Sequence, residues 1–182
     1  MGIGAQLVTI VVDVANVMGS RPDGWWRDRA GAAVRLHAEI ARLAASGRAI
    51  LRDGPGEAGE PGEPGENEAE QATVPGFVMV LEGAAKAAAA RLASAEPDAQ
   101  AEPGALGPSS GSAAPDALQP VRPGEVRVVQ AAGSGDDAIV AAVRQLSGRR
   151  VVVTADRELR ERCVAAGAEI RGPGWLLGLL PG

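Results

Sequence analysis

Aromatic residues, cysteine and histidine are scarce in this chain of 182 residues, and their scarcity excludes several kinds of protein. With a single cysteine, Cys163, the chain cannot form an intramolecular disulfide or a multi-cysteine zinc site. The only histidine, His37, lies within a predicted helix, so a histidine-based catalytic triad is unsupported. No apolar run approaches the roughly 18 residues of a membrane span. The first apolar run lacks a basic leader and is interrupted by Asp13, which favours a buried strand over a signal peptide. These absences predict a cytoplasmic protein with no membrane partner.

Charge is distributed unevenly along the chain, although its formal net value is only −5. Residues 53–72 contain seven acids and residues 94–120 contain four, and neither segment contains a base. The remainder of the chain, without these eleven acids, therefore has a formal net charge of +6. A basic body suits a polyanionic partner such as RNA. Most of the bases are arginine, which matches phosphate geometry well, although genomic base composition also explains this preference.

Short apolar, β-branched runs alternate with amphipathic segments, which predicts an α/β fold with a central, mostly parallel sheet of four to five strands. Hydrophobic residues make up 46% of the chain, but only four residues are aromatic, so Val, Leu, Ile and Ala must fill the core. We predict strands at residues 6–13, 76–82, 125–130 and 150–154, with a short fifth strand at 168–170. We predict helices at residues 26–46, 83–95, 135–147 and 156–166, and a closing helical turn at 173–180. In the first helix, one stripe is expected to face the core: Ala30, Ala33, Val34, His37, Ile40, Ala41 and Ala44.

Two segments rich in Gly, Pro, Glu and Ser interrupt this pattern, at residues 53–75 and 96–123. Their composition cannot bury enough apolar surface to offset the entropy of ordering, which predicts disordered linkers. The acids that they separate belong to one proposed site. We therefore interpret residues 1–182 as a single domain with two insertions.

Acidic residues follow the predicted strands where each strand ends. Because the carboxyl ends of parallel strands meet at one edge of a sheet, these acids are expected to lie close together. Such a cluster needs a positive occupant, and oxygen ligands suit Mg²⁺ or Mn²⁺. The acids are Asp13, Glu82, Asp136, Asp137 and Asp156.

Each acid taken alone also has a purely structural interpretation. Asp13 could cap a turn in which Asn16 takes a left-handed conformation. Asp136 and Asp137 would occupy the first turn of a helix, where the helix dipole favours acids by about 0.3–1 kcal/mol each. Asp156 could be the N-cap of the next helix. Their joint placement at strand ends of the same polarity favours a site.

Polar and aromatic neighbours of these acids are candidates for substrate binding. Asn16 could orient a phosphate or a water, and Ser134 could cap a helix or contact a phosphate. Thr154 and Arg157 flank Asp156 and could also contact phosphate. A second group of candidates lies after the first strand, where a base could stack on Trp25 and where Arg29 could contact phosphate. The pair Trp25–Trp26 could equally pack the start of a helix onto the core.

The segments, taken in this order, resemble the NYN branch of the PIN-like ribonuclease superfamily, especially its bacterial YacP-like members. The matching pieces are VVDVANVMGS, WWRDRAG, VMVLEG, GSGDDAIV and VVTADRELRERCVAAGAEIRGP. The resemblance implies a PIN-like Rossmannoid three-layer fold and a metal-dependent nuclease, in most members acting on RNA. It assigns Asp13, Asp136 and Asp156 to the core acids, Asn16 to the polar residue of the first motif and Asp137 to the second acid of the paired motif. Glu82 stands where the family is expected to have aspartate.

The sequence therefore predicts metal-dependent hydrolysis of RNA, with Asp13, Asp136 and Asp156 as the catalytic acids. Glu82 or Asp137 would orient the attacking water or hold a second ion. Two alternatives remain open: a metal-dependent nucleotide pyrophosphohydrolase, and a non-catalytic module that binds RNA or protein. Self-association into a homo-oligomer is also left open.

Overall fold

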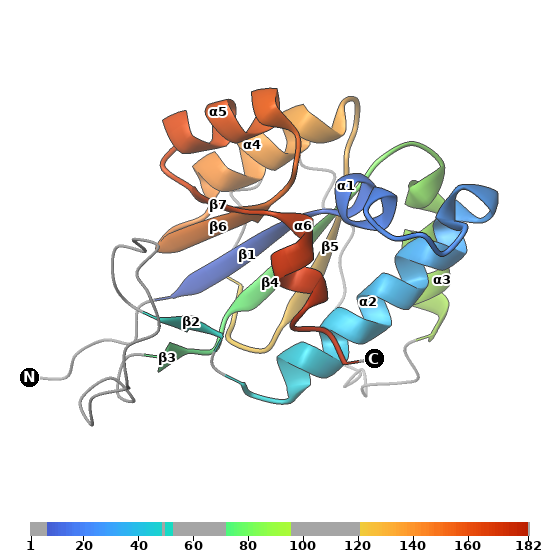
Figure 1. Cartoon of the computed structure of the whole chain (residues 1–182), viewed down its shortest axis with the longest axis horizontal. Coiled ribbons are helices and arrows are strands. Elements are labelled where there is room, and N and C mark those ends of the chain that lie inside the picture. Colours follow the sequence, from blue (N-terminus) through green and yellow to red (C-terminus); the bar gives the residue numbers. More distant parts are fainter. Residues whose placement is uncertain (1–6, 49, 53–71, 96–120, 182) are drawn as a thin grey trace, which may run out of the picture.

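Five parallel strands form the central sheet of the protein, as the computed structural model shows for residues 7–48, 50–52, 72–95 and 121–181 (Figure 1). The order across the sheet is β5-β4-β1-β6-β7, so the first strand of the chain lies at the centre. The predicted α/β class with a parallel sheet is confirmed. The strands are β1 (Val8–Asp13), β4 (Gly76–Leu81), β5 (Val126–Gln130), β6 (Arg149–Val153) and β7 (Glu169–Arg171). A separate antiparallel pair joins β2 (Leu51–Arg52) to β3 (Ala72–Thr73).

The central strands are continuous apolar runs because both of their faces are covered. Every residue of β1 and β4 is buried. The register places Val11 opposite Val78 on one side and opposite Val152 on the other. Alternate residues of each strand therefore enter two different cores.

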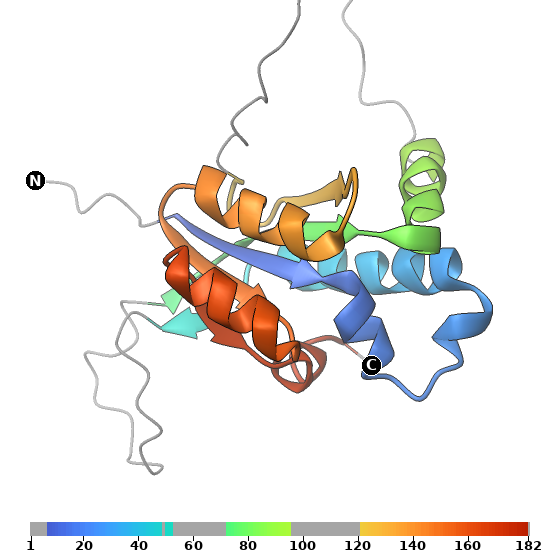
Figure 2. The same cartoon turned by 90° about the horizontal axis from the view of Figure 1, so that it is seen from above.

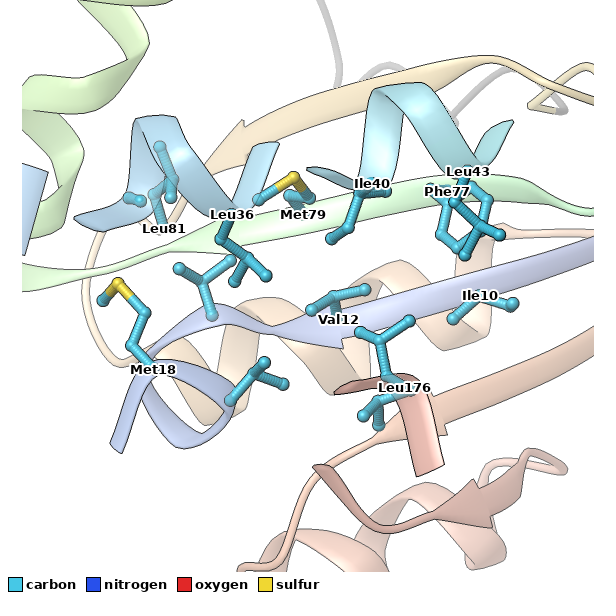
Figure 3. Close-up of a cluster of buried hydrophobic side chains, with 14 of the residues drawn as sticks. Ile10, Val12, Met18, Leu36, Ile40, Leu43, Phe77, Met79, Leu81 and Leu176 are labelled. Carbon is cyan, nitrogen blue, oxygen red and sulfur yellow. The ribbon is translucent and has the colours of Figure 1, made fainter. Parts of the chain in front are cut away.

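One face of the sheet carries the larger core, against which α2 (Arg29–Ala45) packs (Figure 3). Leu36 and Ile40 of α2 are fully buried and lie with Val12 and Met79 of the sheet in this core. Three further helices contribute buried side chains to the same face: α1 (Val14–Gly19), α3 (Ala87–Ala95) and α6 (Pro173–Leu177).

The opposite face is covered by α4 (Gly135–Gln145) and α5 (Arg157–Ala165), which lie side by side (Figure 2). Ile139 and Val143 of α4 and Leu159 of α5 pack on Val11 and Val152 in the second core. The molecule thus has three layers, helices on both faces of one sheet. None of the helices in the described ranges has the length and apolarity that a bilayer crossing requires.

The direction of chain travel across the sheet reverses between β1 and β6. From β1 the chain passes over the α2 face to β4 and β5, whereas β6 continues over the α4–α5 face to β7. This reversal makes the carboxyl ends of β1 and β6 a topological switch point, where open α/β sheets bind ligands. Topology therefore points to this edge as the place to look for a site.

Several predicted boundaries were wrong, each for a local reason. The residues after Asp13 form helix α1 and not a turn, because Asp13 caps the helix by accepting a hydrogen bond from the Asn16 N–H. Helix α2 begins at Arg29 and not at residue 26, after a 3-10 turn, η1 (Trp25–Arg27), and its N-cap Asp28 accepts from the Gly31 N–H. Residues 83–86, predicted as α-helix, form the 3-10 turn η3 (Gly83–Lys86).

The predicted stripe of α2 is confirmed at Ala30, Ala33, Ile40 and Ala44, which are buried, while Val34, His37 and Ala41 are half-buried. The prediction omitted Leu36 and Leu43, which are among the most buried side chains of the helix. The larger Leu side chains bury more apolar area than Ala at the predicted positions, so they set the orientation of the helix.

The two predicted linkers fall mostly outside the described residues, at 53–71 and 96–120. Their ends were predicted wrongly. Residues 72–73 form β3, and Val121 is buried in the second core. The Val121 side chain packs in that core, but the Pro- and Gly-rich residues around it gave no sign of this in the sequence.

Candidate functional site

Asp13 is the buried centre of the carboxylate edge. Its Oδ1 accepts a hydrogen bond of 3.0 Å from the Asn16 N–H, and its Oδ2 accepts one of 2.9 Å from the Thr154 hydroxyl. Burial raises the pKa of Asp13, the two hydrogen bonds oppose this rise, and the charges of Asp136 and Glu82 add to it. Asp13 is therefore a fixed carboxylate whose ionised form is disfavoured mainly by burial and further by the charges of Asp136 and Glu82.

The ends of β1 and β6 are joined by a second set of bonds around Thr154. The Asn16 Oδ1 accepts from the Ala155 N–H at 3.1 Å, and the Thr154 Oγ1 accepts from the Asp156 N–H at 3.1 Å. Thr154 is completely buried, so its hydroxyl is used inside the protein. The structure gives this residue a positioning contact with Asp13, where the sequence suggested a contact with phosphate.

Glu82 follows β4 and reaches the start of α4. Its Oε2 accepts a hydrogen bond of 2.9 Å from the Gly135 N–H. Ser134 occupies the N-cap position of α4 but makes no capping hydrogen bond with its side chain. A Cβ at Gly135 would lie 2.4 Å from the Glu82 Oε2, so only glycine allows this approach. Glu82 thus satisfies a helix N-terminus from a different strand.

The paired acids at the start of α4 have different surroundings. Burial raises the pKa of Asp136, and the charges of Asp156 and Glu82 raise it further, while Arg162 opposes the shift. Asp137 is more exposed and forms an ion pair with Arg162 of α5. The sequence motif suggested a shared role for the two residues. In the structure, Asp136 interacts with the charges of Asp156 and Glu82, whereas Asp137 pairs with Arg162.

Asp156 caps α5 and also belongs to the cluster. Its Oδ1 accepts a hydrogen bond of 2.8 Å from the Leu159 N–H, so the predicted N-cap is confirmed. Its charge is the largest electrostatic contribution to the raised pKa of Asp136. The structural and functional interpretations of Asp156 are therefore compatible.

The donor set at this edge suits a hard cation by its chemistry. All four carboxylates, from Asp13, Glu82, Asp136 and Asp156, offer oxygen. Within the described ranges, no three Asp, Glu, His or Cys side chains are grouped so that they could hold one metal ion. Mg²⁺ commonly binds through one or two carboxylates, waters and substrate phosphates, without a closed protein cage. The residues present fit an ion of that kind.

Three other predicted substrate-binding residues lie outside this hydrogen-bonded network. Trp25 is packed against the α2-face core, and the guanidinium of Arg29 lies 5.3 Å from its ring centroid. Arg157 is exposed at the start of α5, where it pairs with Glu161 at 3.3 Å. Arg157 also borders a shallow hollow of about 620 Å³ between α5 and β7, whose lining contains none of the four carboxylates.

Sequence reasoning missed Arg162, a cation that pairs with Asp137 and lowers the pKa of Asp136. No local motif marks Arg162, because its partner is 25 residues away on α4 and the contact depends on how α4 and α5 pack. Cys163, its neighbour, is buried, and burial raises the pKa of its thiol to about 11. The cysteine therefore remains a protonated core residue at neutral pH.

No protein-family model, curated protein or solved structure matches this chain.

Proposed function

We propose that this protein is a metal-dependent nuclease that cleaves RNA phosphodiester bonds at the carboxyl edge of its sheet. The observation that carries the proposal is the convergence of Asp13, Glu82, Asp136 and Asp156 at the carboxyl edge of the sheet, near the ends of β1 and β6. Their charges raise the pKa values of Asp13 and Asp136, so these side chains lie close enough to repel one another.

The excess of negative charge among these four acids favours a cation as ligand. Arg162 is the cation that lowers the pKa of Asp136, and it is already paired with Asp137. Acids whose pKa values are shifted by burial and by neighbouring charges cluster at functional sites, which supports a functional role for this group. A divalent ion would convert the repulsion into attraction.

One or two of the acids Asp13, Asp136 and Asp156 would bind the ion directly, waters and the substrate phosphate would complete its coordination, and Glu82 would lie beside them. Such an ion polarises a phosphoryl oxygen and makes water a better nucleophile at neutral pH. Mg²⁺ or Mn²⁺ fits an all-oxygen set of ligands.

The neighbouring residues of the chain orient these acids. The Thr154 hydroxyl and the Asn16 N–H fix both oxygens of Asp13. The Asn16 side-chain oxygen accepts from the Ala155 N–H, and its amide nitrogen would donate to a phosphate. Arg157, exposed at the first turn of α5, can contact the phosphate backbone.

RNA is the proposed substrate because the chain outside its two acidic segments has a net charge of +6. The resemblance to PIN-like nucleases agrees with this substrate. A cytoplasmic location remains part of the proposal, on the basis of the single buried cysteine.

A cleavage assay tests the proposal directly. The purified protein would be incubated with single-stranded RNA, structured RNA, DNA and a panel of nucleoside triphosphates, with Mn²⁺, with Mg²⁺ and with EDTA. We expect metal-dependent RNA cleavage that Asp136→Asn abolishes. Glu125→Gln is the matched control, because Glu125 lies just before β5, at the amino end of that strand, and pairs with Arg127 and not with the cluster. Hydrolysis of free nucleotides alone would instead identify a pyrophosphohydrolase. Metal-independent RNA binding without cleavage would identify a binding module.

A further inference from the structure

Trp26 presents a large aromatic ring to solvent on the loop after α1. Its exposed fraction is 57%, and the only other exposed large hydrophobic residue in the described ranges is Val164. Its neighbour Trp25 is half-buried against the α2-face core. The two tryptophans therefore have different roles, and the ring available for stacking is that of Trp26.

The surroundings of Trp26 hold its ring in a defined position. The Trp25 and Trp26 rings meet edge to face, with centroids 6.3 Å apart and an angle of 86° between their planes. The Trp25 N–H donates to the Asp23 carboxylate at 3.1 Å, and the Arg27 N–H donates to the Gly24 carbonyl at 3.0 Å. Gly24 supplies the left-handed conformation, φ 74°, that begins the turn. An exposed ring supported in this way loses little conformational freedom when a ligand binds.

Arginine side chains lie next to Trp26 in the chain. The side chain of Arg27 is exposed and forms no ion pair with the described residues, and the guanidinium of Arg29 lies over the Trp25 ring, which itself contacts Trp26. The acids of the same segment are engaged elsewhere. Asp28 caps α2 and pairs with Arg91 at 3.6 Å, and Asp23 accepts from the Trp25 backbone. The loop therefore offers an aromatic face next to the unpaired guanidinium of Arg27.

The loop lies at the same end of the molecule as the carboxylate edge. Figure 2 shows α1 directly beyond the arrowhead of β1 and the loop beyond α1. Helix α1 has six residues, which span about 9 Å. A Cβ at Gly19 would lie 3.8 Å from the Trp25 Cζ2, so the Trp25 ring packs on the end of this helix. A chain that crosses the carboxylate edge can therefore also reach Trp26.

We infer that Trp26, flanked by Arg27 and Arg29, is a stacking site for an unpaired base of single-stranded RNA. The inference rests on the proposed function and deepens it by naming the form of the substrate. Bases in a duplex cover each other's faces, whereas an unpaired base can stack on an aromatic side chain while arginine contacts its phosphate. The contact is expected to be tolerant of sequence, since every base has a π face.

Binding without divalent metal tests the inference separately from cleavage. A labelled oligouridylate would be titrated with the protein in EDTA and its anisotropy measured. We expect Trp26→Ala to raise the Kd by about 5- to 150-fold, and Trp26→Phe to retain most of the affinity. Val164→Ala removes the other exposed hydrophobic side chain, on α5, and is expected to leave the Kd unchanged. Arg27→Ala is expected to reduce the slope of log K against log salt by about 0.7.

A second readout identifies the ring. In a Trp175→Phe background, the oligonucleotide should quench tryptophan fluorescence, and Trp26→Phe should remove most of the quenching. Equal affinity of Trp26→Ala and the unchanged protein would overturn the inference, whether or not the protein cuts RNA. Equal competition by duplex RNA would overturn it too, as would a change of oligomeric state in Trp26→Ala without a change in RNA affinity. Loss of binding in this variant, in a protein that cuts no RNA, would support the stacking site and reject the nuclease.

Discussion

The hydroxyl of Thr154 donates a hydrogen bond of 2.9 Å to the Oδ2 of Asp13, although the two residues are 141 positions apart in the chain. Both side chains are buried, at the ends of two adjacent parallel strands. The same hydroxyl oxygen accepts from the Asp156 N–H. One buried side chain therefore connects two of the proposed catalytic acids.

Thr154→Val keeps the shape of this side chain and removes both of its hydrogen bonds. We expect a loss of stability of about 1–3 kcal/mol, because the buried Asp13 carboxylate loses a donor. The Thr154 hydrogen bond lowers the pKa of Asp13, so its loss should raise that pKa further and move the acidic limb of the activity profile to higher pH. Urea unfolding and a pH–rate profile measure the two effects. Thr154→Ser retains the hydroxyl and is the control. Equal stability and equal pH–rate profiles of the valine and serine variants would show that this hydrogen bond contributes to neither property.

Asp136→Asn should make the metal-free protein more stable while it abolishes activity. The substitution removes the repulsion between Asp136 and the charges of Asp156 and Glu82. We expect the Tm to rise by up to about 4 °C, since partly exposed charges interact by at most about 1 kcal/mol and this energy shifts Tm by about 2–4 °C. Thermal unfolding in EDTA measures the change. A lower Tm in the variant would contradict the repulsion.

The stability difference between Asp136→Asn and the unchanged protein should depend on pH with a definite sign. The folded state raises the pKa of Asp136 above the unfolded value of about 3.9. The ionised carboxylate therefore costs stability at neutral pH, and this cost is removed as the pH falls through the folded pKa. Urea unfolding of both proteins between pH 7 and about pH 4 should show the difference shrinking on acidification. A difference that grows at low pH would reject the assignment.

Glu82 combines a capping role and a charge, and two substitutions separate them. Glu82→Gln keeps an oxygen that can accept from the Gly135 N–H, whereas Glu82→Ala removes it. We expect the alanine variant to lose about 0.5–2 kcal/mol relative to the glutamine variant, the usual range for loss of a helix cap. Denaturant unfolding compares them. If both variants unfold at the same denaturant concentration, the long-range cap contributes nothing.

Leu36→Ala tests the core that positions the site. Leu36 is fully buried between α2 and the sheet, and its removal leaves a cavity among Val12, Met79 and Ile40 (Figure 3). We expect destabilisation of about 2–5 kcal/mol, with a preserved fold at low temperature. The free energy of unfolding in urea checks this value, and Val164→Ala, on an exposed side chain, should change it by less than about 0.5 kcal/mol.

Local signals predicted most of the elements. The run VTIVVD is mostly apolar, without alternation, because its strand is buried on both faces, and β1 indeed lies at the centre of the sheet. Asp156 was recognisable as a cap because capping depends only on residues three apart. The placement of acids after strands predicted that they would gather, since all strand ends of one polarity share an edge.

The sequence by itself determined the α/β class, the five strands and the convergence of acids at one edge, because burial periodicity and strand polarity are encoded in neighbouring residues. Tertiary structure alone decided the partner of each acid. Thr154 donates a hydrogen bond to Asp13, Glu82 caps α4 and Arg162 pairs with Asp137. Each of these contacts joins elements that are far apart in the chain. Tertiary packing also decided which tryptophan is exposed, because the burial of Trp25 against the α2-face core leaves only Trp26 of the pair facing solvent. Such pairings depend on how helices and strands pack, and no local pattern of residues specifies that packing.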